Sequence, residues 1–379
     1  MHILIAPNAF KHSLTADETA EAIREGFMRS RLDCTCECFP VADGGDGTGE
    51  LIVRKKEGTW VEAKVHNALG EALAALFGLI DDGQTAVIEM AAASGIRLIK
   101  REDLNPLRAT SFGTGEQIKV ALDRGAKKII IGMGGSATVD GGCGILKALG
   151  IRFLDADGGE LTGLPEALIQ LDRIDTTGMD KRILDGEVVV LCDVDNLLLG
   201  ENGAAAMFGP QKGASPNDVQ TLDAALNRLS QVALQQTCKD MAAVKYGGTA
   251  GGASAGLWAL LGANLVNGID YFLDLTRFDE SLKKADLVIT GEGSIDEQTL
   301  QGKGPFGVAS RAKQFGLPVI GLAGRVPGEP NSQLQQYFDA LLAIGNQPCD
   351  LTAALAATAG NLRRTAEELG NLLAVVEKG

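Results

Sequence analysis

Near its end the chain reads DLVIT at residues 286–290, PVIGL at 318–322 and ALLAI at 340–344. Helical sequence is expected near 306–315, near Gln333 and in an alanine-rich stretch that follows the last apolar run. Apolar strands that alternate with helices are typical of a parallel sheet covered on both faces. This part of the chain therefore predicts an α/β fold.

The beginning of the chain has the same pattern. Residues 2–7 (HILIAP) predict a strand, and residues 34–41 predict a second extended segment. Between them, Thr15 is followed three residues later by Glu18, a capping-box pattern that predicts a helix running to about Arg31. We expect the two ends of the chain to form two halves of one parallel sheet.

The middle of the chain differs from both ends. The segments 59–65 (TWVEAKV), 72–80 (ALAALFGLI) and 85–90 (TAVIEM) are separated by short turn-like stretches, which favours a meander or a mixed sheet. More elements are expected after these segments: strands at 128–133, 150–154 and 188–192, a helix from about Gly144, and a helical stretch at 215–243.

These patterns predict two domains, as does the length of 379 residues. The first is a Rossmann/flavodoxin-like parallel-sheet domain formed by residues 1–62 and 284–379. The second is an inserted α/β domain with a mixed sheet, formed by residues 63–283.

The composition limits the classes of partner. Lys and Arg number 35 and Asp and Glu number 49, so the formal net charge of −14 disfavours nucleic acids and anionic membranes. A small anionic substrate stays allowed, because backbone N–H groups and a bound cation can hold phosphates in an acidic protein. No apolar run approaches the roughly 18 residues of a membrane span, and the run before Pro7 is too short for a signal peptide. We therefore expect a cytoplasmic protein.

The cysteines are expected to be reduced thiols. Seven is an odd number, and Cys34, Cys36 and Cys38 alternate as residues on one face of a strand do, whereas common metal sites use C-x2-C pairs. With only three histidines in the chain, a histidine metal site or a Ser-His-Asp triad has little to draw on.

Four loops rich in glycine and acidic residues each follow a predicted strand. They are 43–48 (DGGDGT), 132–142 (GMGGSATVDGG), 193–200 (DVDNLLLG) and 291–299 (GEGSIDEQT). In open α/β sheets, ligands bind outside the carboxyl ends of strands, where such loops converge. We therefore expect the active site in these loops.

The loop at 132–142 is the best candidate for binding nucleotide phosphates. Backbone N–H groups from Gly134, Gly135 and Ser136 can close around phosphate oxygens at the start of the helix that follows. The loop matches neither the Walker A order nor G-x-G-x-x-G, so a structural turn is the alternative. Gly291 and Gly293 offer a second glycine loop for the same role.

Aspartate and glutamate side chains without histidine suit a magnesium–phosphate site, because Mg²⁺ prefers hard oxygen ligands. Helix or turn capping is the alternative for each acid. The candidates are Asp43, Asp46, Asp140, Asp193, Asp195, Glu292 and Asp296. Among them, Asp193 and Glu292 are the expected metal ligands.

Lysine and arginine side chains are needed to meet an anionic substrate. Lys11 follows the first strand, Lys303 lies in a glycine loop, and Arg325 follows the strand at 318–322. A cation in such a place can pair with a carboxylate or a transferring phosphoryl group. Ordinary solvent exposure is the alternative, and Lys11 has the most favourable position.

Several long motifs resemble the glycerate kinase type-1 family, and they span nearly the whole chain in the expected order. They are APNAFKHSLTADETAEAI (6–23), VADGGDGT (41–48), IGMGGSATVDGGCG (131–144), CDVDNLLLGENGAA (192–205) with FGPQKGA (208–214), and VITGEGSIDEQTLQGKGP (288–305). The resemblance implies ATP-dependent phosphorylation of D-glycerate to 2-phosphoglycerate, with Mg²⁺, in a two-domain α/β fold with a cleft between the domains.

Residue roles are assigned from chemistry. Asp193 or Asp296 is expected to accept the hydroxyl proton, and Lys11 or Arg325 to hold the glycerate carboxylate. Asp43 is a further substrate-binding acid. Three alternatives stay open: a glycerate 3-kinase, a kinase of another small hydroxy acid, and a non-catalytic nucleotide or sugar-acid sensor. The sequence also allows a homo-oligomer.

Overall fold

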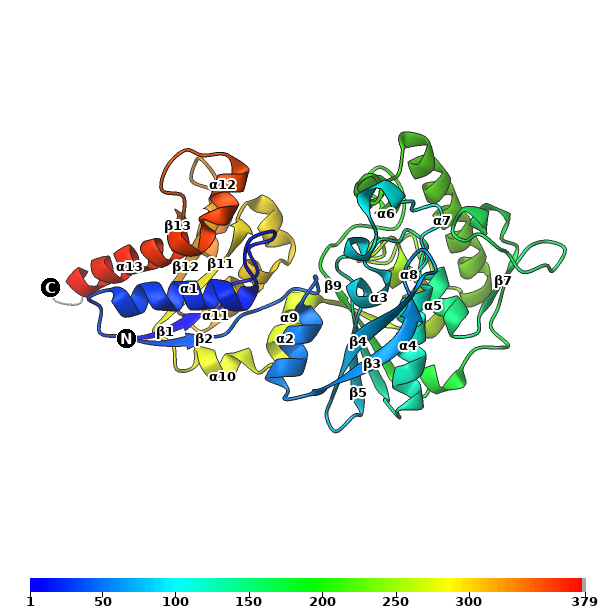
Figure 1. Ribbon diagram of the computed structural model, residues 1–379, viewed down its shortest axis with the longest axis horizontal. Coiled ribbons are helices and arrows are strands. Elements are labelled where there is room, and N and C mark those ends of the chain that lie inside the picture. Colours follow the sequence, from blue (N-terminus) through cyan, green and yellow to red (C-terminus); the bar gives the residue numbers. More distant parts are fainter. Residues whose placement is uncertain (377–379) are drawn as a thin grey trace. The chain divides into compact units, whose positions relative to one another are not determined.

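The computed structural model describes residues 1–376, which divide into two compact units (Figure 1). The first unit contains Met1–Asp43 and the chain from Ile269 onward, and the second unit is Gly44–Gly268. The first unit is therefore discontinuous in sequence, and the whole second unit is inserted after Asp43.

The first unit is built on a fully parallel sheet of five strands. They are β1 (His2–Ile5), β2 (Thr35–Cys38), β11 (Leu287–Ser294), β12 (Val319–Arg325) and β13 (Ala340–Ala343). Their spatial order is β13-β12-β11-β1-β2, which is the 2-1-3-4-5 order of flavodoxin-like folds. Ile3 pairs with Leu287 on one side and Cys36 on the other, so the order reverses between β1 and β11. Such a switch point is where α/β sheets bind ligands.

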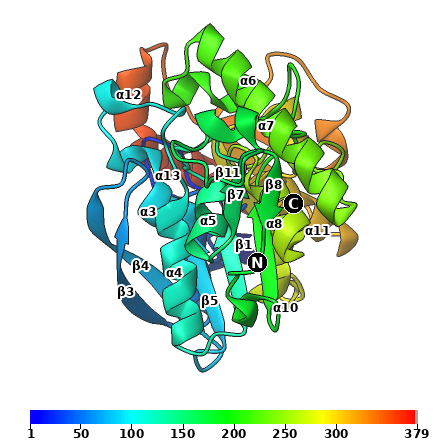
Figure 2. The same cartoon turned by 90° about the vertical axis from the view of Figure 1, so that its right-hand side faces the viewer.

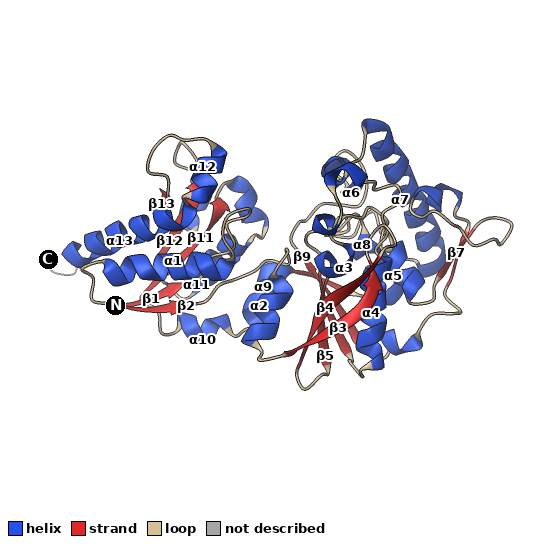
Figure 3. Ribbon diagram, viewed as in Figure 1, coloured by secondary structure: helices blue, strands red, loops and turns tan. Residues whose placement is uncertain are grey.

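Helices cover the sheet of the first unit (Figure 3). They are α1 (Ala16–Arg29), α9 (Gly268–Leu275), α10 (Phe278–Leu282), α11 (Gly304–Gln314), α12 (Leu351–Ala356) and α13 (Thr358–Val376), with 3-10 turns η6 (Glu297–Gln301) and η7 (Leu334–Gln336). The predicted capping box is present: the Thr15 side chain accepts from the Glu18 N–H, and Glu18 accepts from the Thr15 N–H.

The helix expected near Gln333 is only the single 3-10 turn η7. The Asn331 side chain accepts the N–H groups of Gln333 and Leu334. One turn already places Leu334 and Phe338 in buried positions, and β13 begins directly afterwards. The other residues between β12 and β13 form turns and loops, so no full helix lies in this segment.

The second unit contains a mixed sheet of six strands. They are β3 (Thr59–His66), β4 (Ala72–Ile80), β5 (Thr85–Glu89), β6 (Lys128–Gly132), β9 (Glu187–Cys192) and β10 (Asn264–Asn267). Their order is β10-β9-β6-β5-β4-β3, with β4 antiparallel to both neighbours and all other pairs parallel. The expected fold class, a parallel-sheet α/β unit with a mixed α/β unit inserted, is confirmed.

Three strands of the second unit differ from expectation, one by its pairing and two because the sequence did not predict them. The predicted strand at 150–154 exists as β7 (Arg152–Leu154), but it pairs antiparallel with β8 (Arg173–Asp175) in a separate small sheet. Strand β10 was not predicted, because its four residues are short of a full apolar run and three of them are only half-buried.

Some helices of the second unit pack against the mixed sheet, and others pack against neighbouring helices or the small sheet (Figure 2). They are α2 (Thr48–Lys55), α3 (Met90–Ser94), α4 (Phe112–Asp123), α5 (Cys143–Ala148), α6 (Ala204–Phe208), α7 (Pro216–Thr237) and α8 (Ala253–Leu261). Short 3-10 turns connect them: η1 (Ile96–Leu98), η2 (Arg101–Asp103), η3 (Glu166–Gln170), η4 (Lys181–Ile183) and η5 (Pro210–Lys212).

The expected domain boundaries, 62/63 and 283/284, fall inside these units. Strand β3 pairs with β4 along its whole length, and Val53 of α2 packs on Gly78 of β4, so residues 44–62 belong with the second unit. Ile269 of α9 packs on Gly307 of α11, and residues 269–283 belong with the first unit.

The three alternating cysteines lie half-buried against the core of the first unit, Cys36 and Cys38 in β2 and Cys34 just before it. Burial and the neighbouring thiols raise the pKa of Cys36 to about 12, so this thiol is a poor source of thiolate. Within residues 1–376, no helix is both long and apolar enough to cross a bilayer.

Candidate functional site

Buried carboxylates gather at the switch point of the first unit. Asn8 follows β1, Asp43 follows the β2 segment, and Glu292 lies in β11. Asp43 and Glu292 are each only 8% exposed. We call Asn8, Asp43 and Glu292, with Thr299 and Gly304, the switch-point cluster. It lies at the carboxyl ends of β1, β2 and β11, where the sequence predicted a ligand site.

Asp43 is held by donors from two elements. Its Oδ2 accepts a hydrogen bond of 2.9 Å from Asn8 Nδ2 and one of 3.3 Å from the Gly304 N–H. Gly304 is the first residue of α11, an eleven-residue helix whose positive dipole end favours an anion. These two donors therefore fix the direction of the Asp43 carboxylate.

Glu292 is in a less favourable environment for a charge. Burial, and then the nearby charge of Asp43, raise the pKa of Glu292 to about 7. The charges of Lys303 and Lys11 and the hydrogen bond from Thr299 Oγ1 (3.2 Å to Oε1) act in the opposite direction. A carboxyl group that is kept buried beside another acid at such a cost marks a functional site.

The donor set at the switch-point cluster fits a magnesium ion. Asp43 and Glu292 supply hard carboxylate oxygens, and a divalent cation would offset the repulsion that raises the pKa of Glu292. Among the residues described, no group of three or more His, Cys, Asp or Glu side chains could hold a metal. Mg²⁺ needs no such group, because it uses one or two carboxylates with substrate phosphates.

The two predicted carboxylate anchors lie in the same unit as this cluster. Lys11 and Arg325 are both exposed, and the charge of Lys11 acts on Glu292. Arg325 is the last residue of β12, and its backbone C=O accepts from the Ile295 N–H (3.0 Å). Both cations are therefore accessible to an anionic ligand at the carboxyl ends of β1 and β12.

Asp296 caps the 3-10 turn η6. Its Oδ1 accepts from the Gln298 N–H (2.9 Å), and its own N–H donates to Thr299 Oγ1 (3.1 Å). The capping alternative is thus present in the structure, and the predicted role of Asp296 as a base stays a prediction.

The two glycines of the 291–299 loop have different surroundings. A Cβ on Gly291 would collide with the C=O of Leu322 in the neighbouring strand, so sheet packing requires glycine there. Gly293 is exposed, and no atom lies within 4 Å of the position of a Cβ. Gly293 is therefore the more open of the two predicted phosphate contacts.

In the second unit, the glycine loop at 132–142 packs closely on the loop at 43–48. The Gly134 N–H donates to the Gly44 C=O (3.1 Å), and a Cβ on Gly134 would collide with Gly45. Gly135 has a φ of +69°, which favours glycine. Its C=O accepts from the Ile96 N–H (2.8 Å). The loop is therefore fixed in one backbone conformation.

Lys212 lies against this loop and was missing from the sequence-based site. Its side chain is only 3% exposed, and its Nζ donates to Ser136 Oγ (2.9 Å) and to the Thr138 C=O (2.7 Å). Burial lowers the pKa of Lys212 to about 8, and the charges of Asp140 and Asp193 oppose this shift. The group is thus still mainly an ammonium at pH 7.

Asp140 is fully buried and anchors the loop internally. Its carboxylate accepts from the Ser111 N–H (2.8 Å), Ser111 Oγ (2.7 Å), the Gly142 N–H (3.0 Å) and the Gly144 N–H (3.1 Å). Four donors satisfy the carboxylate, so Asp140 has the capping role that the sequence left as an alternative. Asp193 is half-buried, and its charge acts on Lys212.

Glu89 is a second residue that sequence reasoning missed. It ends β5, and its Oε1 accepts from the Gly47 N–H (2.8 Å) just before α2. Burial raises the pKa of Glu89, and the charges of Asp46 and Glu50 add to the shift. Asp46 itself pairs with Arg97 (Oδ2–Nη1 2.7 Å). An acid at the carboxyl end of a strand is the signal that could have identified Glu89.

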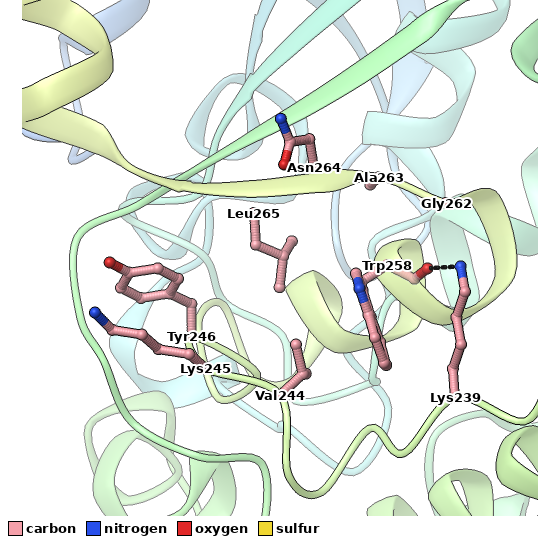
Figure 4. Close-up of a pocket in the computed structure, with 9 residues that line it drawn as sticks. All are labelled: Lys239, Val244, Lys245, Tyr246, Trp258, Gly262, Ala263, Asn264 and Leu265. Carbon is pink, nitrogen blue, oxygen red and sulfur yellow. Dashed lines mark hydrogen bonds between the residues drawn. The ribbon is translucent and has the colours of Figure 1, made fainter.

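A separate pocket of about 520 Å³ lies in the second unit beside the start of β10 (Figure 4). Lys239 donates to the C=O of Trp258 (2.9 Å), and Leu265 points into the space between Tyr246 and Trp258. None of the predicted site residues lines this pocket. The candidate site residues therefore lie in the switch-point cluster and around the glycine loop at 132–142.

The fold and these clusters define an α/β enzyme with buried carboxylates and a fixed glycine loop at the carboxyl ends of its strands. The sequence matches the glycerate kinase family over residues 3–374. It is 45% identical to a glycerate kinase of Bacillus subtilis over 97% of both chains, and 42% identical to the glycerate 2-kinase of Escherichia coli over 99% of this chain and 98% of that one.

A crystal structure of a putative glycerate kinase 2 from Salmonella typhimurium LT2 superposes with a TM-score of 0.84 at 42% identity and covers 100% of both chains. The chain belongs to the glycerate kinase family. It is therefore an enzyme, a phosphotransferase that acts as a kinase, and the resemblance seen in the sequence is confirmed.

Proposed function

We propose that the protein transfers the γ-phosphoryl group of ATP to the 2-hydroxyl of D-glycerate, giving 2-phosphoglycerate and ADP, with Mg²⁺. The observation that carries the proposal is the switch-point cluster, in which Asp43 and Glu292 are buried together at the ligand-binding end of a parallel sheet. The name of the E. coli relative, glycerate 2-kinase, supports the 2-position. Because ATP is the phosphoryl donor, we place the reaction in the cytoplasm.

Phosphoryl transfer depends mainly on positioning and on neutralisation of charge. The loop from Gly134 to Ser136 would hold the nucleotide phosphates, with Gly293 as the alternative contact. Lys212 fixes the shape of this loop through Ser136 and Thr138. A lysine buried there also supplies a positive field for the phosphates.

Glu292 and Asp193 are the proposed metal ligands, and Asp43 beside Glu292 adds a third carboxylate. Held by these carboxylates, Mg²⁺ would supply positive charge to neutralise the charge that develops on the phosphoryl group. The residues of the chain orient it: Asn8 and Gly304 hold the Asp43 carboxylate, and Thr299 holds Glu292.

The proton of the glycerate hydroxyl needs an acceptor. Asp193 is the stronger candidate, because the Asp296 carboxylate already accepts the Gln298 N–H as the cap of η6. Arg325 or Lys11 would hold the glycerate carboxylate, since both cations are exposed at the carboxyl ends of strands.

The test is incubation with ATP, Mg²⁺ and D-glycerate, followed by identification of the product by ³¹P NMR. We expect 2-phosphoglycerate, and L-glycerate serves as the control substrate. Accumulation of 3-phosphoglycerate would assign a glycerate 3-kinase, and turnover only of another hydroxy acid would change the substrate. Binding of ATP and glycerate without any turnover would favour a sensor.

A further inference from the structure

Strand β3 forms one free edge of the six-stranded sheet in the second unit (Figure 2). It has eight residues, contains no proline, and pairs with β4 without interruption from Thr59–Leu79 to His66–Ala72. A long, regular edge without a bulge or proline is a template for pairing with another strand.

The hairpin shows which backbone groups of β3 face outward. The Asn67 N–H donates to the Glu71 C=O (2.7 Å), so the odd-numbered residues of β3 bond to β4 and the even-numbered residues direct their N–H and C=O groups away from the sheet. Two even-numbered N–H groups at the ends have partners, Gly58 with the Val53 C=O and His66 with Glu116 Oε2, both at 2.8 Å.

The outward-facing groups in the middle of the strand belong to Trp60, Glu62 and Lys64. The side chains of these residues are exposed on one face of the sheet, whereas Val61 and Val65 are buried on the other. Trp60 is 48% exposed. An incoming strand therefore meets open backbone groups, an aromatic ring and two opposite charges.

We propose that β3 pairs antiparallel with β3 of a second copy of this chain, about a two-fold axis at Ala63, and joins the two sheets into one. In this register Glu62 lies opposite Lys64 of the partner subunit, and Lys64 lies opposite the partner's Glu62. Two ion pairs then form alongside the backbone hydrogen bonds, and Trp60 lies opposite the partner's His66.

The charges select this register. Pairing must match even-numbered residues with even-numbered residues, because only these have outward groups. The neighbouring registers set Glu62 opposite the partner's Glu62, or Lys64 opposite the partner's Lys64, and like charges directly opposite are destabilising. Charges on edge strands usually prevent pairing. Here the negative charge of Glu62 and the positive charge of Lys64 lie two residues apart, so the strand is complementary to an antiparallel copy of itself.

The test measures mass in solution by light scattering coupled to gel filtration, at two protein concentrations tenfold apart. The wild-type chain is expected to shift toward dimer at the higher concentration. Glu62→Lys alone or Lys64→Glu alone is expected to be monomeric, because each puts like charges opposite one another. A mixture of these two variants is expected to regain the dimer, and so is the double variant Glu62→Lys/Lys64→Glu.

Glu201→Lys is the matched control, since it makes the same change of charge on an exposed turn outside the sheet. Glu62→Pro removes one outward N–H and is also expected to be monomeric. Thermal unfolding followed by circular dichroism verifies that each variant is folded. A wild-type monomer at both concentrations would overturn the proposal, as would a dimer that persists in Glu62→Lys and Lys64→Glu.

Discussion

The side-chain amide of Asn8 donates a hydrogen bond to Asp43, and this bond connects the segments that follow β1 and β2. The donor is itself fixed, since Asn8 Oδ1 accepts from the Ala9 N–H (2.8 Å) and the Asn8 N–H donates to the Gly291 C=O (2.8 Å). Asn8 therefore links the segments that follow β1 and β2 to strand β11. The direction of the Asp43 carboxylate depends on that residue.

Asn8→Ala is expected to lower kcat/KM roughly 10–100-fold, the usual effect of losing a group that orients a ligand-holding carboxylate. Asp43→Asn should lower it further. Steady-state kinetics with glycerate and ATP measure both. Asn371→Ala, which removes an acceptor for Arg31 at the other end of the unit, is the control. Unchanged kinetics in Asn8→Ala would remove the orienting role.

The raised pKa of Glu292 predicts a pH-dependent stability. A carboxyl with a folded-state pKa of about 7 and an ordinary value of 4.5 in the unfolded chain favours folding when protonated, so stability falls as the pH rises from 4.5 through 7. With chelator present at pH 8, Glu292→Gln should therefore unfold at a higher temperature than the wild type. The free energy of unfolding of the variant should be greater by up to about 3 kcal/mol. At pH 5 the difference should be small.

Differential scanning calorimetry at the two pH values checks this expectation. Thr299→Val, which removes the hydroxyl donor to Glu292, should raise the pKa further and increase the pH dependence. An equal effect of Glu292→Gln at pH 5 and pH 8 would contradict the assignment.

Lys212→Met is expected to raise the KM for ATP more than the KM for glycerate. The variant loses two hydrogen bonds from a charged donor to Ser136 and Thr138, each worth about 1.5–3 kcal/mol. An increase of at least ~10-fold in the KM for ATP is expected. Lys239→Met is the matched control, because that lysine also donates to a backbone C=O in the same unit but lies at the separate pocket.

Lys212→Arg distinguishes the loop role from general loss of packing. Partial recovery of the KM for ATP is expected, since the guanidinium can still donate to Ser136 or Thr138. Equal increases in the KM for ATP and for glycerate would show that Lys212 does not act on the nucleotide loop.

The fold was predictable where local signals agreed with the tertiary environment. The Thr15–Glu18 capping box and the apolar runs of β11, β12 and β13 each indicated an element correctly. Domain boundaries were not predictable, because the residues around 44–62 are assigned by pairing between β3 and β4 rather than by composition. Strand β10 gave too short a signal.

Some residues of the candidate site were predictable from the sequence and others were not. Acids that follow strands were found by position, and the structure brings Asp43 and Glu292 together. Lys212 was missed although its motif had been noticed, because burial of a lysine depends on what packs around it and leaves no mark in the local sequence. Glu89 was missed because it ends an apolar run and was counted as part of the strand.

The roles of Asp193 and Asp296 can be distinguished by three substitutions. Asp193→Asn is expected to lower kcat roughly 10²–10⁴-fold with little change in stability, the usual effect of losing a general base. Asp296→Asn keeps an N-cap side chain and should retain most of kcat, whereas Asp296→Ala should lose about 1 kcal/mol of stability. A larger kcat loss in Asp296→Asn than in Asp193→Asn would reverse the assignment.

Removal of divalent metal is expected to abolish turnover. The acids at the strand ends are hard oxygen donors, so Mg²⁺ or Mn²⁺ should restore activity after dialysis against EDTA, and Zn²⁺ should not be required. Turnover is measured as ADP production in a coupled enzyme assay. Full turnover in the metal-free protein would exclude the metal from the reaction.

The insertion after Asp43 also determines the order in which the protein is completed during synthesis. Strand β1 lies between β2 and β11, but β11 leaves the ribosome only after the whole of Gly44–Gly268 has been made. At about 5–20 residues per second, this takes roughly 10–45 s. One edge of β1 has no native neighbour during that time, while the contiguous second unit can already fold. In the nascent chain, β1 therefore cannot complete its native pairing until β11 has been synthesised.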